Sequence, residues 1–296
     1  MSKVLGDFSA MICTANLLLE LIGISTPNPE LFSLARKYVA ESDKNKESYL
    51  REIKQGFELL KQNLPAEEAL QFFKLILEKT KSINTNRRLF LVSGRAASGK
   101  SFVSQKLRNL FGNMEVVDGD GYLLPTRKER AKYENQPLKK FQLPLFESHL
   151  TILSYSTDAI PEWHYSEWDG QVVTNGKIGK NLENDIIVDS VFYGTLEDYE
   201  RLTALSTAAI FVATEDSVAL VNRIRRDLKF RNASCDIVYT KIQNDYVRLL
   251  KQHIPLNWIY LKKSKFVLLT QVESSNKKEY PFHYSYSIYA RKKDCI

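Results

Sequence analysis

The distribution of apolar positions divides the chain into two parts. Over the first 86 residues, apolar side chains recur at three- and four-residue spacing, which is the period of amphipathic helices. This pattern predicts helices over residues 30–41, 46–62 and 66–81. An earlier apolar run, residues 8–24, contains Glu20 and lacks a cationic leader, so we expect a core helix rather than a signal peptide or membrane span. The first part is therefore predicted to be a helical N-terminal extension, residues 1–86.

Beyond residue 86 the pattern changes to short runs rich in β-branched residues, separated by helical patterns. The predicted strands are RRLFLVSG from residue 87, MEVVD at 114–118, DIIVDSVF at 185–192, AAIFVA at 208–213 and KFVLLT at 265–270. Because such alternation is typical of βαβ units, we expect an α/β domain over residues 87–296, with a mainly parallel sheet flanked by helices. Residues 119–184 lack clear periodicity and follow the second strand, at the sheet edge where α/β folds bind ligands.

The loop between the first of these strands and the helix after it, residues 94–101, has the form G-x-x-x-x-G-K-[ST]. Its glycines permit a backbone that turns several N–H groups toward one point, where the following helix adds its positive end. Lys100 can reach the outer phosphates of a nucleotide, and Ser101 can ligate Mg²⁺. We therefore predict that ATP and Mg²⁺ bind here. The predicted nucleotide-binding residues are Gly94, Arg95, Ala96, Ala97, Ser98, Gly99, Lys100, Ser101 and Phe102.

Other strings narrow the class of phosphate-loop protein. A GTPase would carry an N-K-x-D guanine motif, and the nearest string, residues 276–279, ends in Glu instead. A motor ATPase would usually end its second acidic strand with Asp-Glu, whereas Asp189 is followed by Ser190. These departures favour a small-molecule kinase. In that class a carboxylate at the position of Asp189 faces Mg²⁺ or its waters, although an ordinary polar strand end is the alternative.

A pair of carboxylates follows the second strand. Asp118 and Asp120 are two residues apart, so both would project toward one face if the strand continued. A phosphate acceptor needs a carboxylate that orients its hydroxyl and takes its proton. Either residue could serve, and an Asp-Gly turn that merely closes the strand is the alternative.

Several cations lie on the predicted helix 216–232. Arg223 and Arg226 share one face of this helix through their i, i+3 spacing. Charged helix faces are usually solvated. After the fourth strand of a phosphate-loop fold, however, arginines can close over the nucleotide and stabilise charge on the transferring group.

The charge balance suits an anionic ligand. Lys and Arg number 42 against 35 Asp and Glu, which gives a net charge of +7. The three cysteines lie far apart without C-x-x-C spacing, so they indicate neither a zinc site nor a disulfide framework. We expect a cytoplasmic protein that binds neither nucleic acid nor a membrane.

Together these motifs resemble the pantothenate kinase, uridine kinase and phosphoribulokinase group of P-loop kinases, and within it the type I (bacterial) pantothenate kinases. About 90 mostly helical residues precede the loop, as in that family. Four strings are similar to family motifs: DGYLLP (120–125) to D-G-F-L-x-P, IPEWHYSEWDG (160–170) to P-x-Y-S-H-x-x-Y-D, VNRIRRDLKFRN (221–232) to I-N-R-F-L-K-F-R, and NWIYLKK (257–263) to N-W-x-x-L-K.

The resemblance implies ATP- and Mg²⁺-dependent transfer of the γ-phosphoryl group to a primary hydroxyl, as in coenzyme A biosynthesis. Asp120 would be the catalytic base, which favours it over Asp118, and Arg223 would stabilise the transferring group together with Lys100. The implied assembly is a homodimer with coenzyme A as an inhibitor. The implied substrate contacts are Asp120, Tyr122, Trp163, Tyr165, Trp168, Arg223 and Asn257.

The acceptor pocket departs from the family pattern. Tyr165 stands where the family has a histidine, and two tryptophans stand at its tyrosine positions. Asp189 replaces a glutamate, and the R-R-D spacing of residues 225–227 is more typical of uridine kinases. A nucleoside or sugar acceptor is therefore one alternative. A nucleotide-binding regulatory protein without turnover, with the N-terminal helices as its interaction surface, is another, although the intact Lys100 and Asp120 argue against it.

Overall fold

The computed structural model of the protein describes most of the chain from residue 50 onward. The described residues are 33, 34, 37, 50–82, 87–133, 136–166, 169–181, 183–191, 195–214, 216–231, 233–248, 260–272 and 284–294. Within these ranges no helix is long and apolar enough to cross a membrane. Two predicted substrate contacts, Trp168 and Asn257, lie outside the described residues.

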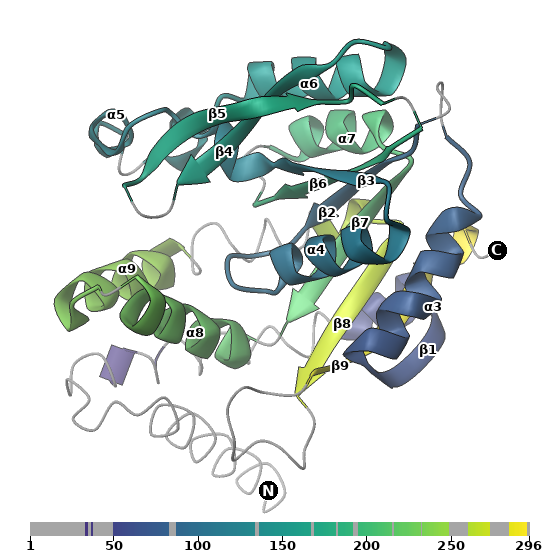
Figure 1. Ribbon diagram of the computed structural model, residues 1–296. Coiled ribbons are helices and arrows are strands. Elements are labelled where there is room, and N and C mark those ends of the chain that lie inside the picture. The colour runs from purple at the N-terminus through teal and green to yellow at the C-terminus, as the bar shows by residue number, and fades with distance from the viewer. Residues whose placement is uncertain are drawn as a thin grey trace, which may run out of the picture.

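A seven-stranded sheet with the order β1-β9-β8-β7-β2-β6-β3 forms the centre of the fold (Figure 1). Its strands are β1 (Phe57–Pro65), β2 (Leu89–Ser93), β3 (Met114–Asp118), β6 (Asp185–Ser190), β7 (Ala208–Thr214), β8 (Phe266–Val272) and β9 (Tyr284–Arg291). The five strands from β8 to β3 in this order are parallel, whereas β9 pairs antiparallel with both β8 and β1. The fold is therefore α/β with a mostly parallel sheet, as predicted.

Helices cover both faces of this sheet (Figure 1). Among the described residues after β1, the helices include α3 (Ala66–Glu78), α4 (Lys100–Phe111), α5 (Arg127–Ala131), α6 (Leu143–Tyr155), α7 (Leu196–Leu205), α8 (Asp216–Arg225) and α9 (Cys235–Arg248). Buried side chains of α3 and α4 pack on one face of the sheet, and those of α6 and α7 pack on the other. In Figure 1, α8 and α9 lie beside each other, below α4.

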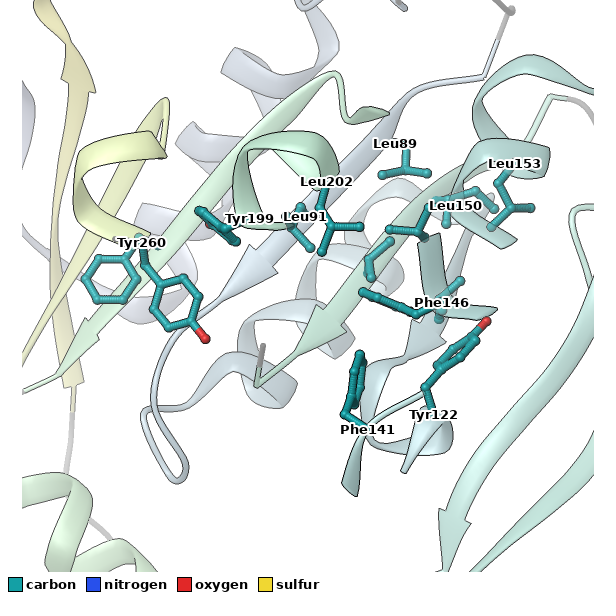
Figure 2. Close-up of a cluster of buried hydrophobic side chains, with 14 of the residues drawn as sticks. Leu89, Leu91, Tyr122, Phe141, Phe146, Leu150, Leu153, Tyr199, Leu202 and Tyr260 are labelled. Atoms are coloured by element: carbon teal, nitrogen blue, oxygen red, sulfur yellow. The ribbon is translucent and has the colours of Figure 1, made fainter. Parts of the chain in front are cut away.

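The central strand β2 shows why the sheet forms where it does. All five of its side chains, LFLVS, are buried, as expected for a parallel strand that is covered on both faces. Leu89 and Leu91 join the cluster of α6 and α7, which Figure 2 shows together with Leu150 and Leu202. Phe90 and the following valine join the cluster of α3 and α4 instead. This alternation places the carboxyl end of β2, where the phosphate loop begins, between two packed layers.

A separate antiparallel hairpin stands on the carboxyl side of β3. Its strands are β4 (Ile160–Ser166) and β5 (Gln171–Ile178), and β4 contacts the short 3₁₀ turn η1 (Gly119–Tyr122) that follows β3. The segment without clear periodicity thus contains this hairpin as well as α5 and α6. No strand was predicted here from the sequence.

The five predicted strands are confirmed as β2, β3, β6, β7 and β8, and the helix predicted at 66–81 is confirmed as α3. Residues 50–56 are helical, and so are the three described positions of the predicted helix 30–41. The remainder of that helix and the apolar run 8–24 lie outside the described residues.

The helix predicted at 46–62 is wrong from residue 57 onward, because β1 begins there. The strand forms an antiparallel ladder with β9 at the edge of the sheet. Its apolar residues serve both faces: Phe57 joins one core cluster, and Leu60 and Leu64 pack against the other. Apolar positions three and four residues apart therefore arise in a strand, and they mimic the spacing of an amphipathic helix.

Candidate active site

The phosphate loop lies between β2 and α4 and is held against the neighbouring strand β7. The Thr214 hydroxyl donates to the carbonyl oxygen of Ser98 at 2.7 Å. A Cβ atom at Gly94 would lie 2.7 Å from the carbonyl oxygen of Val212, so no larger residue fits there without displacing the backbone. Ala97 has φ +62°, a left-handed conformation that is costly for a residue with a side chain and that recurs at functional loops. The loop is therefore closely fixed by its neighbours.

Lys100 begins α4 and is 94% buried, with a relative exposure of 6%. Its Nζ donates to the carbonyl oxygen of Arg95 at 3.0 Å. Burial is the largest influence on its pKa and lowers it, while the charges of Asp189 and Asp120 act in the opposite direction. Arg226 and Arg95 lower the pKa further. The charges of Asp189, Asp120 and Arg226 thus all act on the lysine of the phosphate loop.

Strand register explains how the carboxylates meet. Asp118 of β3 pairs with Asp189 of β6, and Asp189 pairs with Val92 of β2, the residue two positions before the loop. Because parallel strands end at the same edge, these side chains gather beside the phosphate loop. Asp189 is half-buried there.

Asp118 and Asp120 have different surroundings. The Oδ1 atom of Asp118 accepts from the backbone N–H of Asp120 at 2.9 Å, and its Oδ2 atom accepts from the N–H of Tyr165 at 3.1 Å. Nδ1 of His164 lies 3.0 Å from the same Oδ2. Burial raises the pKa of Asp118, and these hydrogen bonds oppose the rise. Asp118 therefore connects η1 to the hairpin, whereas Asp120 lies one turn further on and acts on Lys100.

His164 was not predicted from the sequence. Its side chain is 56% exposed on β4, beside Asp118. The alternation of β4 could have indicated it, because Glu162, His164 and Ser166 share one face of the strand in the string EWHYS.

The predicted aromatic contacts divide between core and surface. Tyr122 is only 1% exposed, and its hydroxyl lies 2.9 Å from Nδ1 of His149 (Figure 2 shows Tyr122 beside Phe146). Burial raises the pKa of Tyr122 and lowers that of His149, so both are neutral at pH 7. The half-buried Trp163 ring packs against both, with centroids 5.4 and 5.6 Å away. The structure therefore places the Tyr122 hydroxyl in the core rather than at an exposed surface.

Tyr165, the third predicted aromatic contact, lies further along the hairpin. The guanidinium carbon of Arg130 stands 5.2 Å from the centre of its ring. Arg130 itself is buried and donates to the backbone carbonyl oxygens of Leu124 and Gly170, so the ring rests on a fixed cation. The face of Tyr165 is thus held in one orientation.

The predicted arginine helix is interrupted within its run of cations, after Arg223 and Arg225. α8 ends at Arg225, and a π-helical turn, Arg226–Phe230, follows. Such turns are rare and occur often at functional sites. Arg223 and Arg226 are both half-buried. The Tyr284 hydroxyl of β9 donates to Oδ1 of Asn222 at 3.0 Å, which joins α8 to the sheet.

The residues around the loop fit a nucleotide phosphate and a magnesium ion. Within the described part of the chain, the buried Ser98 hydroxyl has no hydrogen-bond partner, and α4 has no acidic residue in its first turn to oppose an anion. Ser101 and Asp189 offer oxygen donors, which Mg²⁺ prefers. No cluster of three or more His, Cys, Asp or Glu occurs among the described residues that could hold a metal by itself. Phosphate-bound Mg²⁺ needs only one or two protein ligands, so this donor set is sufficient.

Sequence comparison identifies the family. The chain is 31% identical over 157 residues to uridine kinase from Lactococcus lactis subsp. cremoris, an alignment that covers 51% of this chain and 73% of that kinase. The chain belongs to the uridine kinase-like family of P-loop kinases. Uridine kinase from Streptococcus gordonii is 30% identical over 161 residues, which cover 52% of this chain and 74% of that one. No family model matches the chain.

Solved structures give a weaker likeness. D-glycerate 3-kinase from Cryptococcus neoformans var. grubii is 11% identical, covers 74% of this chain and 98% of its own, and superimposes with a TM-score of 0.45. Membership in the kinase family, together with the parallel sheet and the loop geometry, makes the chain a P-loop small-molecule kinase. The narrower resemblance to type I pantothenate kinases stays a prediction.

Proposed function

We propose that the protein transfers the γ-phosphoryl group of ATP to a hydroxyl of a pyrimidine nucleoside, with uridine as the first acceptor to test. The similarity to uridine kinases over nearly three quarters of their length carries this proposal. The sequence motifs alone favoured pantothenate over a nucleoside as the acceptor, and this proposal reverses that order. The hairpin offers the half-buried Trp163 and the oriented ring of Tyr165 to a flat base.

Each residue near the loop has a distinct task in this proposal. Lys100 and the loop N–H groups hold the phosphates, and Ser101 and Asp189 hold the metal. When bound, ATP supplies the phosphoryl group and Mg²⁺ neutralises part of its charge. Asp120 orients the acceptor hydroxyl and takes its proton. Asp118 is less suited to this task, because both of its oxygens accept backbone hydrogen bonds that link η1 to the hairpin. Catalysis is then mainly positioning and electrostatic stabilisation.

Arginines of the α8 region complete the site in this proposal. Arg223 lies on the helix itself, and Arg226 adds positive potential at Lys100. Such side chains would stabilise the charge that develops on the phosphoryl group during transfer. They would therefore raise the rate of transfer rather than the affinity for the acceptor.

Pantothenate is the second candidate acceptor. The string DGYLLP, which resembles the motif of type I pantothenate kinases, begins with Asp120 inside η1, the turn that contacts the hairpin. On this alternative, coenzyme A is the expected inhibitor. The departures at Tyr165 and Trp163 leave fewer polar partners for pantothenate than the family motif would supply.

A coupled assay of ADP release, with product masses measured, separates these acceptors. Uridine, cytidine, pantothenate and D-glycerate are compared at matched concentrations, and we expect uridine to turn over fastest. Faster turnover with pantothenate would overturn the nucleoside assignment. ATP binding without turnover of any acceptor would overturn the kinase proposal itself.

The control for this assay is Lys100→Ala. It removes a charge-assisted contact to the transferring phosphate, so turnover should fall by about 10²–10³-fold. The melting temperature of the variant is measured in parallel. Unchanged turnover in a folded variant would contradict the phosphate-loop assignment.

A further inference from the structure

A hydrogen-bonded pair of neutral side chains lies behind the turn that carries Asp120. The hydroxyl of Tyr122, the last residue of η1, lies 2.9 Å from Nδ1 of His149 on α6. Both residues are buried. The rings of Phe146 and Phe141 lie 4.8 and 6.4 Å from that of Tyr122, so the surroundings of the pair are largely apolar (Figure 2). Polar groups in such surroundings are stable only while their hydrogen bond is made.

An apolar pair would fill the same space without this cost. Replacing both partners of a buried hydrogen bond by apolar groups of similar shape is often nearly neutral for stability. An apolar contact has no preferred direction, however, whereas a hydrogen bond constrains the angle at which its two groups meet. The bond between Tyr122 and His149 therefore points to a role in orientation rather than in stability alone.

The orientation of Tyr122 affects Asp120 through a short, closed turn. The N–H of Leu123 donates to the carbonyl oxygen of Asp120 at 3.2 Å, which closes the turn around Gly121 and Tyr122. The backbone of the same turn lies against the hairpin, because a Cβ atom at Gly121 would lie 2.5 Å from the carbonyl oxygen of Trp163. A fixed Tyr122 ring therefore also fixes the backbone that carries Asp120.

The same pair supports the aromatic ring of the hairpin. The centre of the half-buried Trp163 ring lies 5.4 Å from that of Tyr122, with the two planes tilted by 40°. It lies 5.6 Å from the centre of the His149 ring, which meets it edge to face at 67°. His149 thus joins α6 to both parts of the proposed acceptor site, the turn η1 and the strand β4.

We propose that His149 is a positioning residue for the acceptor: its hydrogen bond to Tyr122 and its contact with Trp163 hold η1 and the hairpin at a fixed distance. The inference rests on the proposed function for the roles of Asp120 and the hairpin, and it applies to each of the candidate acceptors. His149 acts through its two neighbours rather than by contact with the acceptor or with ATP, so its loss should affect acceptor kinetics and leave ATP affinity unchanged.

The test compares single and double variants of the pair. Tyr122→Phe and His149→Leu each leave one buried polar group without its partner, so each should lower the melting temperature. Each should also lower kcat/KM for the acceptor by about tenfold, with the Kd of a non-hydrolysable ATP analogue unchanged.

The double variant separates orientation from stability. It contains neither polar group, so its melting temperature should return toward the wild-type value while kcat/KM for the acceptor stays about tenfold low. Recovery of kcat/KM together with the melting temperature would overturn the proposal, because the pair would then serve stability alone.

A conservative variant tests whether the hydrogen bond itself matters. His149→Asn keeps an amide near the position of Nδ1 that can bond the Tyr122 hydroxyl. It should retain more of the acceptor kcat/KM than His149→Leu does. Equal losses in these two variants would overturn the proposal.

The matched control is Ser154→Ala on the same helix. It removes a buried hydroxyl that donates to the carbonyl oxygen of Leu205, the last residue of α7, at 2.7 Å. This variant should lower the melting temperature and leave acceptor kinetics unchanged. An equal loss of kcat/KM would show that any weakening of α6 has this effect, and it would overturn the proposal.

Hydrogen exchange provides a measurement that needs no acceptor. In the double variant, we expect the backbone amides of η1 and β4 to exchange about tenfold faster than in the wild type, with the amides of β2 unchanged. Unchanged exchange in η1 and β4 would overturn the proposal. If none of the acceptors is phosphorylated, the proposed function fails, and this measurement still decides whether His149 holds the two elements together.

Discussion

Two carboxylates at the end of β3, only two residues apart, have different roles in the structure. Asp118 accepts two backbone hydrogen bonds and pairs with His164, so its oxygens are engaged in holding η1 to the hairpin. Asp120 acts on Lys100 from the turn beyond. At the scale of single residues, one carboxylate is suited to positioning and the other to chemistry.

This division predicts different kinetic effects for the same substitution. Asp120→Asn should lower kcat by about 10²–10⁴-fold with little change in ATP affinity, since it removes the proton acceptor. Asp118→Asn should mainly lower the melting temperature and raise KM for the acceptor, because it loosens the hairpin. Steady-state kinetics with calorimetric ATP binding measures both. A severe loss of kcat in Asp118→Asn, with a nearly normal Asp120→Asn, would show that the roles are reversed.

At the scale of elements, the hairpin is positioned by a close approach to η1. A Cβ atom at Gly121 would lie 2.5 Å from the carbonyl oxygen of Trp163 and 2.7 Å from its carbonyl carbon. Since these are backbone atoms, they cannot turn aside as a flexible side chain could. The distance between the hairpin and the turn that bears Asp120 therefore depends on the absence of a side chain at this position.

Gly121→Ala should accordingly move the hairpin away from Asp120. We expect kcat/KM for the acceptor to fall by up to about 10²-fold, as displacements near 1 Å can produce, while ATP affinity stays unchanged. The matched control is Gly176→Ala in the same hairpin, where the new Cβ would meet only a carboxylate oxygen of Glu162 at 3.2 Å. If both variants retain wild-type kinetics, the close approach does not set the acceptor site.

At the scale of the whole molecule, α3 is part of the core of the sheet although it precedes the phosphate loop. Its buried residues, among them Leu70 and Phe73, join a cluster with Phe90 of β2 and Phe266 of β8. The Phe73 and Phe266 rings meet edge to face with centroids 5.4 Å apart. Without this helix, the face of the kinase sheet that α3 and α4 cover together would lose part of its cover.

The same substitution at two positions of α3 tests this role. Leu70 is fully buried, so Leu70→Ala should lower the free energy of unfolding by about 2–5 kcal/mol. Leu75 is 56% exposed, and Leu75→Ala should change it by less than about 0.5 kcal/mol. Denaturant titration monitored by circular dichroism measures the difference. Equal, small effects would show that α3 does not belong to the cooperative core.

The local sequence determined those features whose signals are contiguous. The G-x-x-x-x-G-K-[ST] string predicted the phosphate loop, and runs such as AAIFVA predicted the central strands, because a parallel strand that is buried on both faces must be apolar throughout. Asp189 could also be predicted as a strand-end carboxylate. Each of these predictions depends only on neighbours along the chain.

The tertiary structure alone decided the features that depend on partners distant in sequence. β1 is a strand because β9, more than 200 residues later, supplies its ladder, and nothing within its own helix-like spacing encodes that partner. Tyr122 is buried because His149 and Trp163 pack around it. Asp118 holds the hairpin because its Oδ2 accepts the N–H of Tyr165, a partner 47 residues away in the sequence. Strand pairing and side-chain packing across the sheet join residues that are distant in sequence, so they cannot be predicted from the periodicity of a single segment.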